Sequence, residues 1–146
     1  MNGRALGIDP GTVRIGLALS DPLGITAQPI EYLERVGSRR DLNNLSQCVR
    51  EHEVRTVVIG LPLTLAGEEG AAARASREMA EGLARRLPGV RIELWDERLT
   101  TVQAERTMVA GKARRAKRRQ RIDSLAAALI LQSWLDAQAF ERTESD

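Results

Sequence analysis

The chain has 146 residues, of which 42% are hydrophobic and 29% are charged. This length and composition are typical of one globular domain with an apolar core. The single cysteine, Cys48, excludes an internal disulfide, and no apolar run approaches the roughly 20 residues that span a membrane. Because the N-terminus also lacks a signal pattern, we expect a cytoplasmic protein with one domain over residues 1–140 and a frayed acidic tail over residues 141–146.

The net charge of +2 conceals a strong asymmetry. Between Lys112 and Arg121, seven of ten residues are basic, and no acidic residue occurs from Arg106 to Ile122. Without those seven cations, the chain of 22 basic and 20 acidic residues would have a net charge of −5. Such a run repels itself and attracts polyanions. We expect nucleic acid as the partner; a localisation signal or an acidic membrane surface is the alternative.

Strands and helices are predicted to alternate along the chain. Apolar and β-branched runs predict strands over residues 5–9, 15–19, 27–35, 54–59 and 90–95. Helical spacing and composition predict helices over residues 38–53, 68–87, 100–110 and 122–140. We expect Ser38 to cap the first helix, and Thr100 with Gln103 to form a capping box.

This order predicts an α/β fold with a five-stranded mixed sheet, in which three antiparallel strands are followed by two parallel strands, flanked by helices. Functional groups in such sheets gather at the carboxyl ends of the strands. The first strand is the expected centre, because both halves of the sheet grow from it.

Asp9 ends the first predicted strand beside a Pro-Gly turn. The small side chains there allow a charged ligand to approach the backbone, so we expect Gly11 and Thr12 to form a substrate-approach loop. The alternative is that Asp9 only caps the turn.

Two further acids stand at predicted element ends. Glu97 follows the fifth strand, and Asp123 is expected in the first turn of the last helix. Three acids without His or Cys specify Mg²⁺ or Mn²⁺, and two such ions can support phosphodiester hydrolysis. The alternatives are a surface ion pair of Glu97 with Arg98 and a helix-dipole role for Asp123.

Four motifs resemble the YqgF family, also called RuvX. They are Leu6-Gly-Ile-Asp-Pro-Gly-Thr-Val-Arg-Ile-Gly16, Val58-Ile-Gly-Leu-Pro62, Asp96-Glu-Arg-Leu-Thr-Thr101 and Asp123-Ser-Leu-Ala-Ala127. They lie in the family's order, and the resemblance covers residues 6 to about 135. Proteins of this family are described as ribonuclease H-like Holliday junction resolvases and as nucleases that process the 5′ end of precursor 16S ribosomal RNA.

The resemblance implies that Asp9, Glu97 and Asp123 are the catalytic and metal-binding acids, with Asp96 as an outer ligand. It also shows a departure from the RuvC resolvases. Their pattern has a glutamate at the end of the fourth strand, where this chain has Gly60 and its neighbours, and a further acid three residues after the last-helix aspartate, where this chain has Ala126.

Other chemistry is not indicated. The sole histidine, His52, lies in a polar stretch without a nucleophile, and the chain has no zinc knuckle or nucleotide-binding P-loop. Because the chain has few aromatic residues for base stacking, we expect nucleic acid to be recognised by its phosphates and its shape. The expected contacts are basic side chains: Arg14, Arg98, Lys112, Arg114, Arg115, Lys117, Arg118, Arg119 and Arg121.

The sequence therefore predicts a divalent-metal-dependent endonuclease acting on structured nucleic acid. Precursor ribosomal RNA, including a ribosomal precursor particle, is the favoured substrate, and branched DNA is the alternative. Two other classes remain open: a small actin-like ATPase and a non-catalytic RNA-binding factor for ribosome assembly. We expect a monomer or a homodimer, since a symmetric junction cutter needs two sites.

Overall fold

The computed structural model describes residues 3–100 and 116–145, with side chains described for residues 3–100 and 124–142. A five-stranded sheet has the order β3-β2-β1-β4-β5. The strands are β1 (Arg4–Pro10), β2 (Arg14–Ser20), β3 (Ala27–Glu34), β4 (Val54–Leu61) and β5 (Arg91–Asp96). The helices are α1 (Ser38–Glu51), α2 (Ala71–Arg86) and α4 (Ala116–Ser145).

The first three strands are antiparallel, and β4 and β5 add in parallel to β1. The expected fold class and strand order are confirmed. Because β1 pairs antiparallel with β2 on one side and parallel with β4 on the other, its carboxyl end lies at the centre of the sheet. This position favours a functional site.

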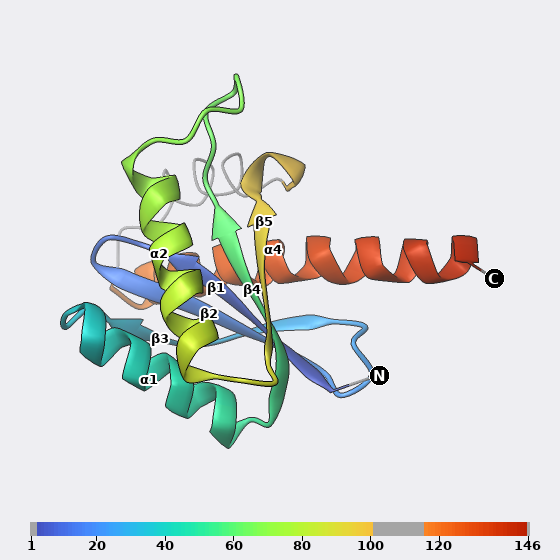
Figure 1. The fold of residues 1–146 in the computed structure, drawn as a ribbon, viewed down its shortest axis with the longest axis horizontal. Coiled ribbons are helices and arrows are strands. Elements are labelled where there is room, and N and C mark those ends of the chain that lie inside the picture. Colours follow the sequence, from blue (N-terminus) through green and yellow to red (C-terminus); the bar gives the residue numbers. More distant parts are fainter. Residues whose placement is uncertain (1–2, 101–115, 146) are drawn as a thin grey trace.

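Helices cover both faces of the sheet (Figure 1). Leu6 and Ile8 of β1 contribute to the core beneath α1 and α2, and Ala5 packs on the opposite face against α4. This division follows from the strand period of two, which alternates side chains between faces. Gly7 shares the face of Ala5 and lets α4 approach closely, since a Cβ at Gly7 would lie 2.8 Å from the Ala127 carbonyl oxygen.

Helix α4 differs from expectation at both ends. α4 begins at Ala116, six residues before the expected start, and continues to Ser145 instead of ending at Phe140. The basic segment therefore enters the helix in part. Ala, Lys, Arg and Gln are strong helix formers, and this propensity outweighs the mutual repulsion that had favoured a non-helical solvated run.

The start of α1 also differs. Gly37 is the N-cap residue and provides no side-chain cap, so the expected capping by Ser38 is wrong. Instead, the buried carboxylate of Asp41 accepts a hydrogen bond from the Val36 N–H (2.9 Å) and pairs with Arg35. An acid inside the first turn thus fixes the chain before the helix. The predicted helix over residues 100–110 lies outside the described residues.

Within the described ranges, no helix combines the length and apolar character needed to span a bilayer. Trp134 of α4 is 7% exposed and belongs to the hydrophobic cluster between α4 and the sheet.

Candidate metal and nucleic-acid site

Asp9 lies within the strand ladder, opposite Gly16 of β2 and two residues before Gly11. It is buried, with 8% of its surface exposed. Because strand side chains alternate, Asp9 shares the face of Gly7, on which α4 packs. The first candidate acid is therefore positioned on the α4 face, at the carboxyl end of the central strand.

Glu97 comes from the neighbouring part of the sheet. It opens a short 3₁₀ turn, Glu97–Leu99, directly after β5, and is 6% exposed. A Cβ at Gly60 of β4 would lie 2.8 Å from Glu97 Oε2. The Glu97 carboxylate thus occupies the space that a side chain at position 60 would need.

Gly60 lies between the two acids, on the strand between β1 and β5. The register of β1 and β4 pairs Ile8 with Ile59, so Asp9 and Gly60 each stand one residue further along adjacent parallel strands. Both are on the α4 face, since a Cβ at Gly60 would also meet Ile130 of α4. The sheet therefore brings Asp9 and Glu97 to the same end and the same face.

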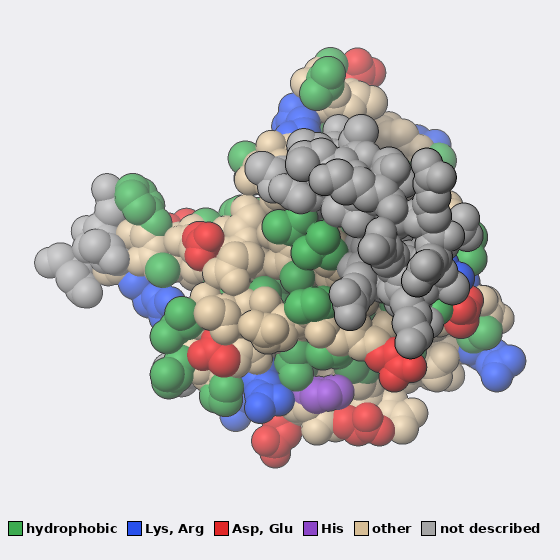
Figure 2. Space-filling model, turned by 180° about the vertical axis from the view of Figure 1, so that it is seen from behind, with side chains coloured by type: hydrophobic (Ala, Val, Ile, Leu, Met, Phe, Trp, Pro, Cys, Tyr) green, Lys and Arg blue, Asp and Glu red, His purple; other side chains and the backbone are tan. Residues whose placement is uncertain are grey.

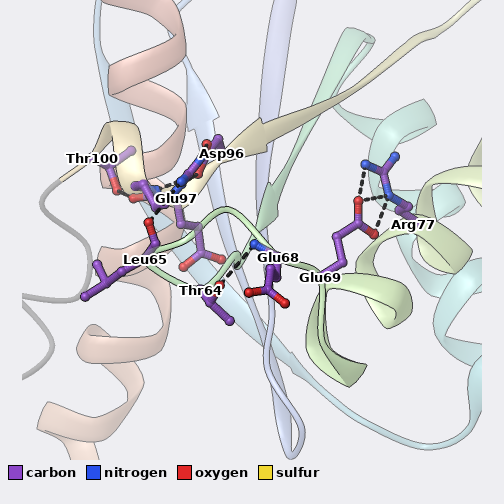
Figure 3. Close-up of polar contacts among 9 residues, drawn as sticks. Thr64, Leu65, Glu68, Glu69, Arg77, Asp96, Glu97 and Thr100 are labelled. Atoms are coloured by element: carbon purple, nitrogen blue, oxygen red, sulfur yellow. Dashed lines mark hydrogen bonds and ion pairs between the residues drawn. The ribbon is translucent and has the colours of Figure 1, made fainter.

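Asp96 has a different partner from Glu97, although the two residues are adjacent. Its carboxylate accepts hydrogen bonds from the Arg98 backbone N–H (2.9 Å) and from the Arg98 guanidinium, with Nη2 2.7 Å from Oδ2. The side-chain hydrogen bond from Arg98 is the main cause that lowers the pKa of Asp96. Figure 3 shows the Glu97 carboxylate pointing away from that of Asp96. The expected ion pair with Arg98 is thus formed by Asp96, and Glu97 faces Gly60.

Arg98 also reaches the loop that follows β4. Its Nη1 donates to the Leu65 carbonyl oxygen at 3.4 Å. Within the loop, Thr64 and Glu68 exchange hydrogen bonds, and beyond it Glu69 forms an ion pair with Arg77 (Figure 3). Arg98 thus links the end of β5 to this loop, and its contact with nucleic acid stays a prediction.

Asp123 lies in α4, one helical turn before Ala127, whose carbonyl faces Gly7. Four residues further along α4, Leu131 also contacts Gly7. The Asp123 backbone is therefore on the part of α4 that crosses the central strand, while its side chain lies outside the described side chains. Asp123 is the eighth residue of the helix and not part of its first turn. The helix-dipole role proposed from the sequence is excluded by this position, because that effect is confined to the terminal turn.

The β1–β2 turn contains the expected substrate-approach loop. Its Gly11 carbonyl accepts a hydrogen bond from Arg35 Nε (2.9 Å), and a Cβ at Gly11 would collide with the Arg14 carbonyl oxygen. Thr12 is exposed. Arg14 is partly buried, lies 3.5 Å from Glu34 and stacks over the Tyr32 ring. The turn is thus held in shape while its tip faces solvent.

The basic segment is described in part. Lys112, Arg114 and Arg115 belong to residues 101–115, which lie outside the described residues. The backbone of Lys117, Arg118, Arg119 and Arg121 belongs to α4, but their side chains are not described. Their contact with nucleic acid stays a prediction.

The donor set of the site fits a hard divalent cation. Asp9 and Glu97 provide carboxylate oxygens, and Gly60 leaves space between the strands that carry them. Among the described side chains, no group of three His, Cys, Asp or Glu residues forms a metal cluster. Asp123 is the third acid expected from the sequence, and its side chain lies outside the described side chains.

Sequence reasoning missed the roles of Gly60 and Arg98. The Val58-Ile-Gly-Leu-Pro62 motif shows a residue without a side chain at the end of a strand, but not which group fills the space beside it. The role of Arg98 depends on the path of the Leu65 loop, which residue spacing does not reveal.

A family model described as "RuvX: Holliday junction resolvase" matches residues 3–137. The chain belongs to the RuvX family. A relative from Myxococcus xanthus is 52% identical over 134 residues, which cover 92% of this chain and 88% of the relative. A relative from Mycobacterium leprae is 49% identical over 134 residues, which cover 92% of this chain and 73% of the relative. Both are named "Putative pre-16S rRNA nuclease".

Among solved structures, RuvC from T. thermophilus in complex with a Holliday junction substrate aligns with a TM-score of 0.60. The alignment covers 94% of this chain and 96% of RuvC, at 15% identity. This similarity shows that the RuvX chain has the ribonuclease H-like fold of the RuvC resolvases. Together with the family, it identifies the chain as a nuclease.

Proposed function

We propose that the protein hydrolyses phosphodiester bonds in structured RNA, with divalent cations held by Asp9, Glu97 and Asp123. The observation that carries the proposal is the convergence of Asp9 and Glu97, two buried acids at the ends of different strands, on one face and one end of the sheet. Acids so placed repel each other, and a shared cation converts that repulsion into attraction.

The bound cations would be Mg²⁺ or Mn²⁺, which activate water and neutralise charge on the phosphate. The carboxylates of the protein would hold these cations in place. Asp9 is fixed by the strand pairing on both sides of β1, and Glu97 by the turn after β5. Gly60 keeps the space in front of Glu97 free of a side chain. Asp96 stays with Arg98 and supports the Glu97 turn, so we assign it a positioning role.

Precursor 16S ribosomal RNA is the substrate that we favour, because relatives that are 52% and 49% identical over 134 aligned residues are named for it. The basic residues from Lys112 to Arg121 would hold the RNA through its phosphates. Branched DNA is the second candidate, favoured by the description of the family model. We place the activity in the cytoplasm, where ribosomal precursors are processed.

The test compares two substrates under three metal conditions. Purified protein is incubated with labelled precursor 16S RNA and with a synthetic four-way DNA junction, each with Mg²⁺, Mn²⁺ or a chelator. We expect metal-dependent cleavage of the RNA near the 5′ end of the mature sequence. Preferential cleavage of the junction would favour the second candidate, and absence of cleavage of both substrates with either metal would contradict the nuclease proposal.

A further inference from the structure

A cavity of about 170 Å³ lies at the opposite end of the sheet from Asp9 and Glu97. It is formed by the N-terminal ends of β1, β4 and β5, the turn between β2 and β3, and the C-terminal part of α4. Three arginines line it: Arg55, Arg91 and Arg142. Viewed from the α4 side, basic side chains lie beside the projecting end of this helix (Figure 2).

The charge of the lining is entirely positive. Its 12 residues include three arginines and no Asp or Glu, although the chain apart from its basic segment has more acids than bases. Within the described part of the chain, Arg55 and Arg142 form no ion pair. Arg91 lies 2.8 Å from Glu93, which stands outside the lining. Two of the three guanidinium groups are therefore available to an anion.

Ser20 adds a buried donor to the cavity wall. It is 2% exposed, and its hydroxyl oxygen accepts a hydrogen bond from the Ala5 N–H at 2.8 Å. A hydroxyl group also donates one hydrogen bond. Among the described residues, no acceptor binds the Ser20 hydroxyl hydrogen. The Gln138 amide lies on the same wall. The cavity thus combines neutral donors with guanidinium groups.

The position of Arg55 is built into the backbone. Gly3 has a φ of +149°, and a Cβ at this residue would collide with the aliphatic part of the Arg55 side chain. Glycine therefore leaves room for Arg55 to lie across the strand ends. Trp134, which also lines the cavity, directs its Nε1 to Glu93 at 3.4 Å, so its polar atom is occupied.

We propose that this cavity binds a phosphate group. Guanidinium groups match the paired oxygens of phosphate, and the Ser20 and Gln138 donors extend the same recognition. The group could belong to the bound nucleic-acid strand or to a free phosphate or mononucleotide. The cavity and the candidate catalytic acids share the α4 face, and Thr56 at the cavity is four residues, about 13 Å, from Gly60 along β4. A strand cleaved at the acids has further phosphates at such distances.

The experiment compares two double variants, each of which loses two positive charges. Arg55→Gln/Arg142→Gln removes the two unpaired arginines and keeps Arg91 beside Glu93. Arg40→Gln/Arg85→Gln removes two exposed arginines from α1 and α2, on the opposite face. Inorganic phosphate and adenosine monophosphate are titrated against each protein, with the Ser20 amide and Trp134 indole NMR signals as readouts. Binding of precursor RNA is measured in chelator over a range of salt concentrations.

We expect saturable shifts of both signals in the parent and in the control, and their loss in the cavity variant. If a strand phosphate is the ligand, the salt slope of RNA binding also falls by about 1.4 to 1.8 in the cavity variant alone. Loss of phosphate binding with an unchanged slope would assign the cavity to a free phosphate. Absence of saturable shifts together with an unchanged slope, or equal effects of both variants, would overturn the proposal.

This test needs no cleavage, because every arm is measured without a divalent metal. Failure of the cavity proposal would leave the nuclease proposal intact. Failure to cleave any substrate would equally leave the phosphate titration valid.

Discussion

Gly60 determines how close the Glu97 carboxylate can lie to the central strands. The Glu97 carboxylate, which follows β5, lies in the space that a side chain at position 60 of β4 would fill. A Cβ at this residue would lie 2.6 Å from Ile130 Cδ1 and 2.8 Å from Glu97 Oε2.

Gly60→Ala should lower both stability and cleavage. We expect a loss of about 1 to 3 kcal/mol in the free energy of unfolding, because overpacking forces Ile130 and Glu97 to move, and a larger fractional loss in single-turnover cleavage. Chemical denaturation and cleavage assays measure the two effects. Gly70→Ala is the control, since a Cβ there meets no atom within 4 Å. A Gly60→Ala variant equal to the parent would show that Glu97 does not need this space.

Asp96 should make stability depend on pH through its bond to Arg98. Its pKa is lowered in the folded protein, so its stabilising contribution is complete above the ordinary value of 3.8 and is lost as the pH falls through the lowered value. Asp96→Asn should therefore be less stable than the parent at neutral pH, and the difference should shrink below about pH 4.

Urea denaturation at several pH values measures this difference. Glu34→Gln is the control, because its ion pair with Arg14 is 3.5 Å long and 59% of the Glu34 side chain is exposed. A difference for Asp96→Asn that persists undiminished at the lowest pH would contradict the assignment.

At the scale of elements, the strands and their order follow from the sequence because apolar runs and turns are local signals. The turn from Asp21 to Gly24 illustrates this, since Asp21 accepts backbone hydrogen bonds from Ile25 and Thr26 as turn chemistry predicts. The start of α4 does not follow so directly. Its basic residues have opposing tendencies, helix propensity and mutual repulsion, and the start of α4 at Ala116 shows that propensity outweighs repulsion from that residue on.

The basic segment should determine the salt dependence of nucleic-acid binding. Changing Arg114, Arg115, Lys117, Arg118 and Arg119 to Gln keeps helix propensity in α4 and removes five charges. We expect the slope of log affinity against log salt to fall by about 3.5 to 4.5 if all five contact phosphates. Fluorescence anisotropy with RNA in chelator measures the slope.

The control for this prediction changes five exposed arginines on α1 and α2 to Gln: Arg39, Arg40, Arg50, Arg74 and Arg85. It should leave the slope nearly unchanged. Equal slopes for the parent and the segment variant would remove the segment from the binding surface.

At the scale of the whole molecule, the candidate site depends on contacts between distant segments. Asp9 and Glu97 could each be predicted from their positions at strand ends, since parallel strands bring such ends together. Their shared face follows from strand alternation. The role of Gly60 between them and the ion pair of Arg98 with Asp96 could be found only from the structure. Those features depend on how β4, β5 and the Leu65 loop pack, which no local pattern encodes.

The most direct test of the central claim is to separate cleavage from binding in Asp9→Asn and Glu97→Gln. Single-turnover cleavage of precursor RNA in Mg²⁺ is measured beside RNA affinity in chelator, with Glu78→Gln on α2 as the control. We expect cleavage to fall by roughly 100-fold or more, because metal-held charge stabilisation is worth several kcal/mol, while affinity and fold persist. Cleavage by both variants at the parent's rate would contradict the account.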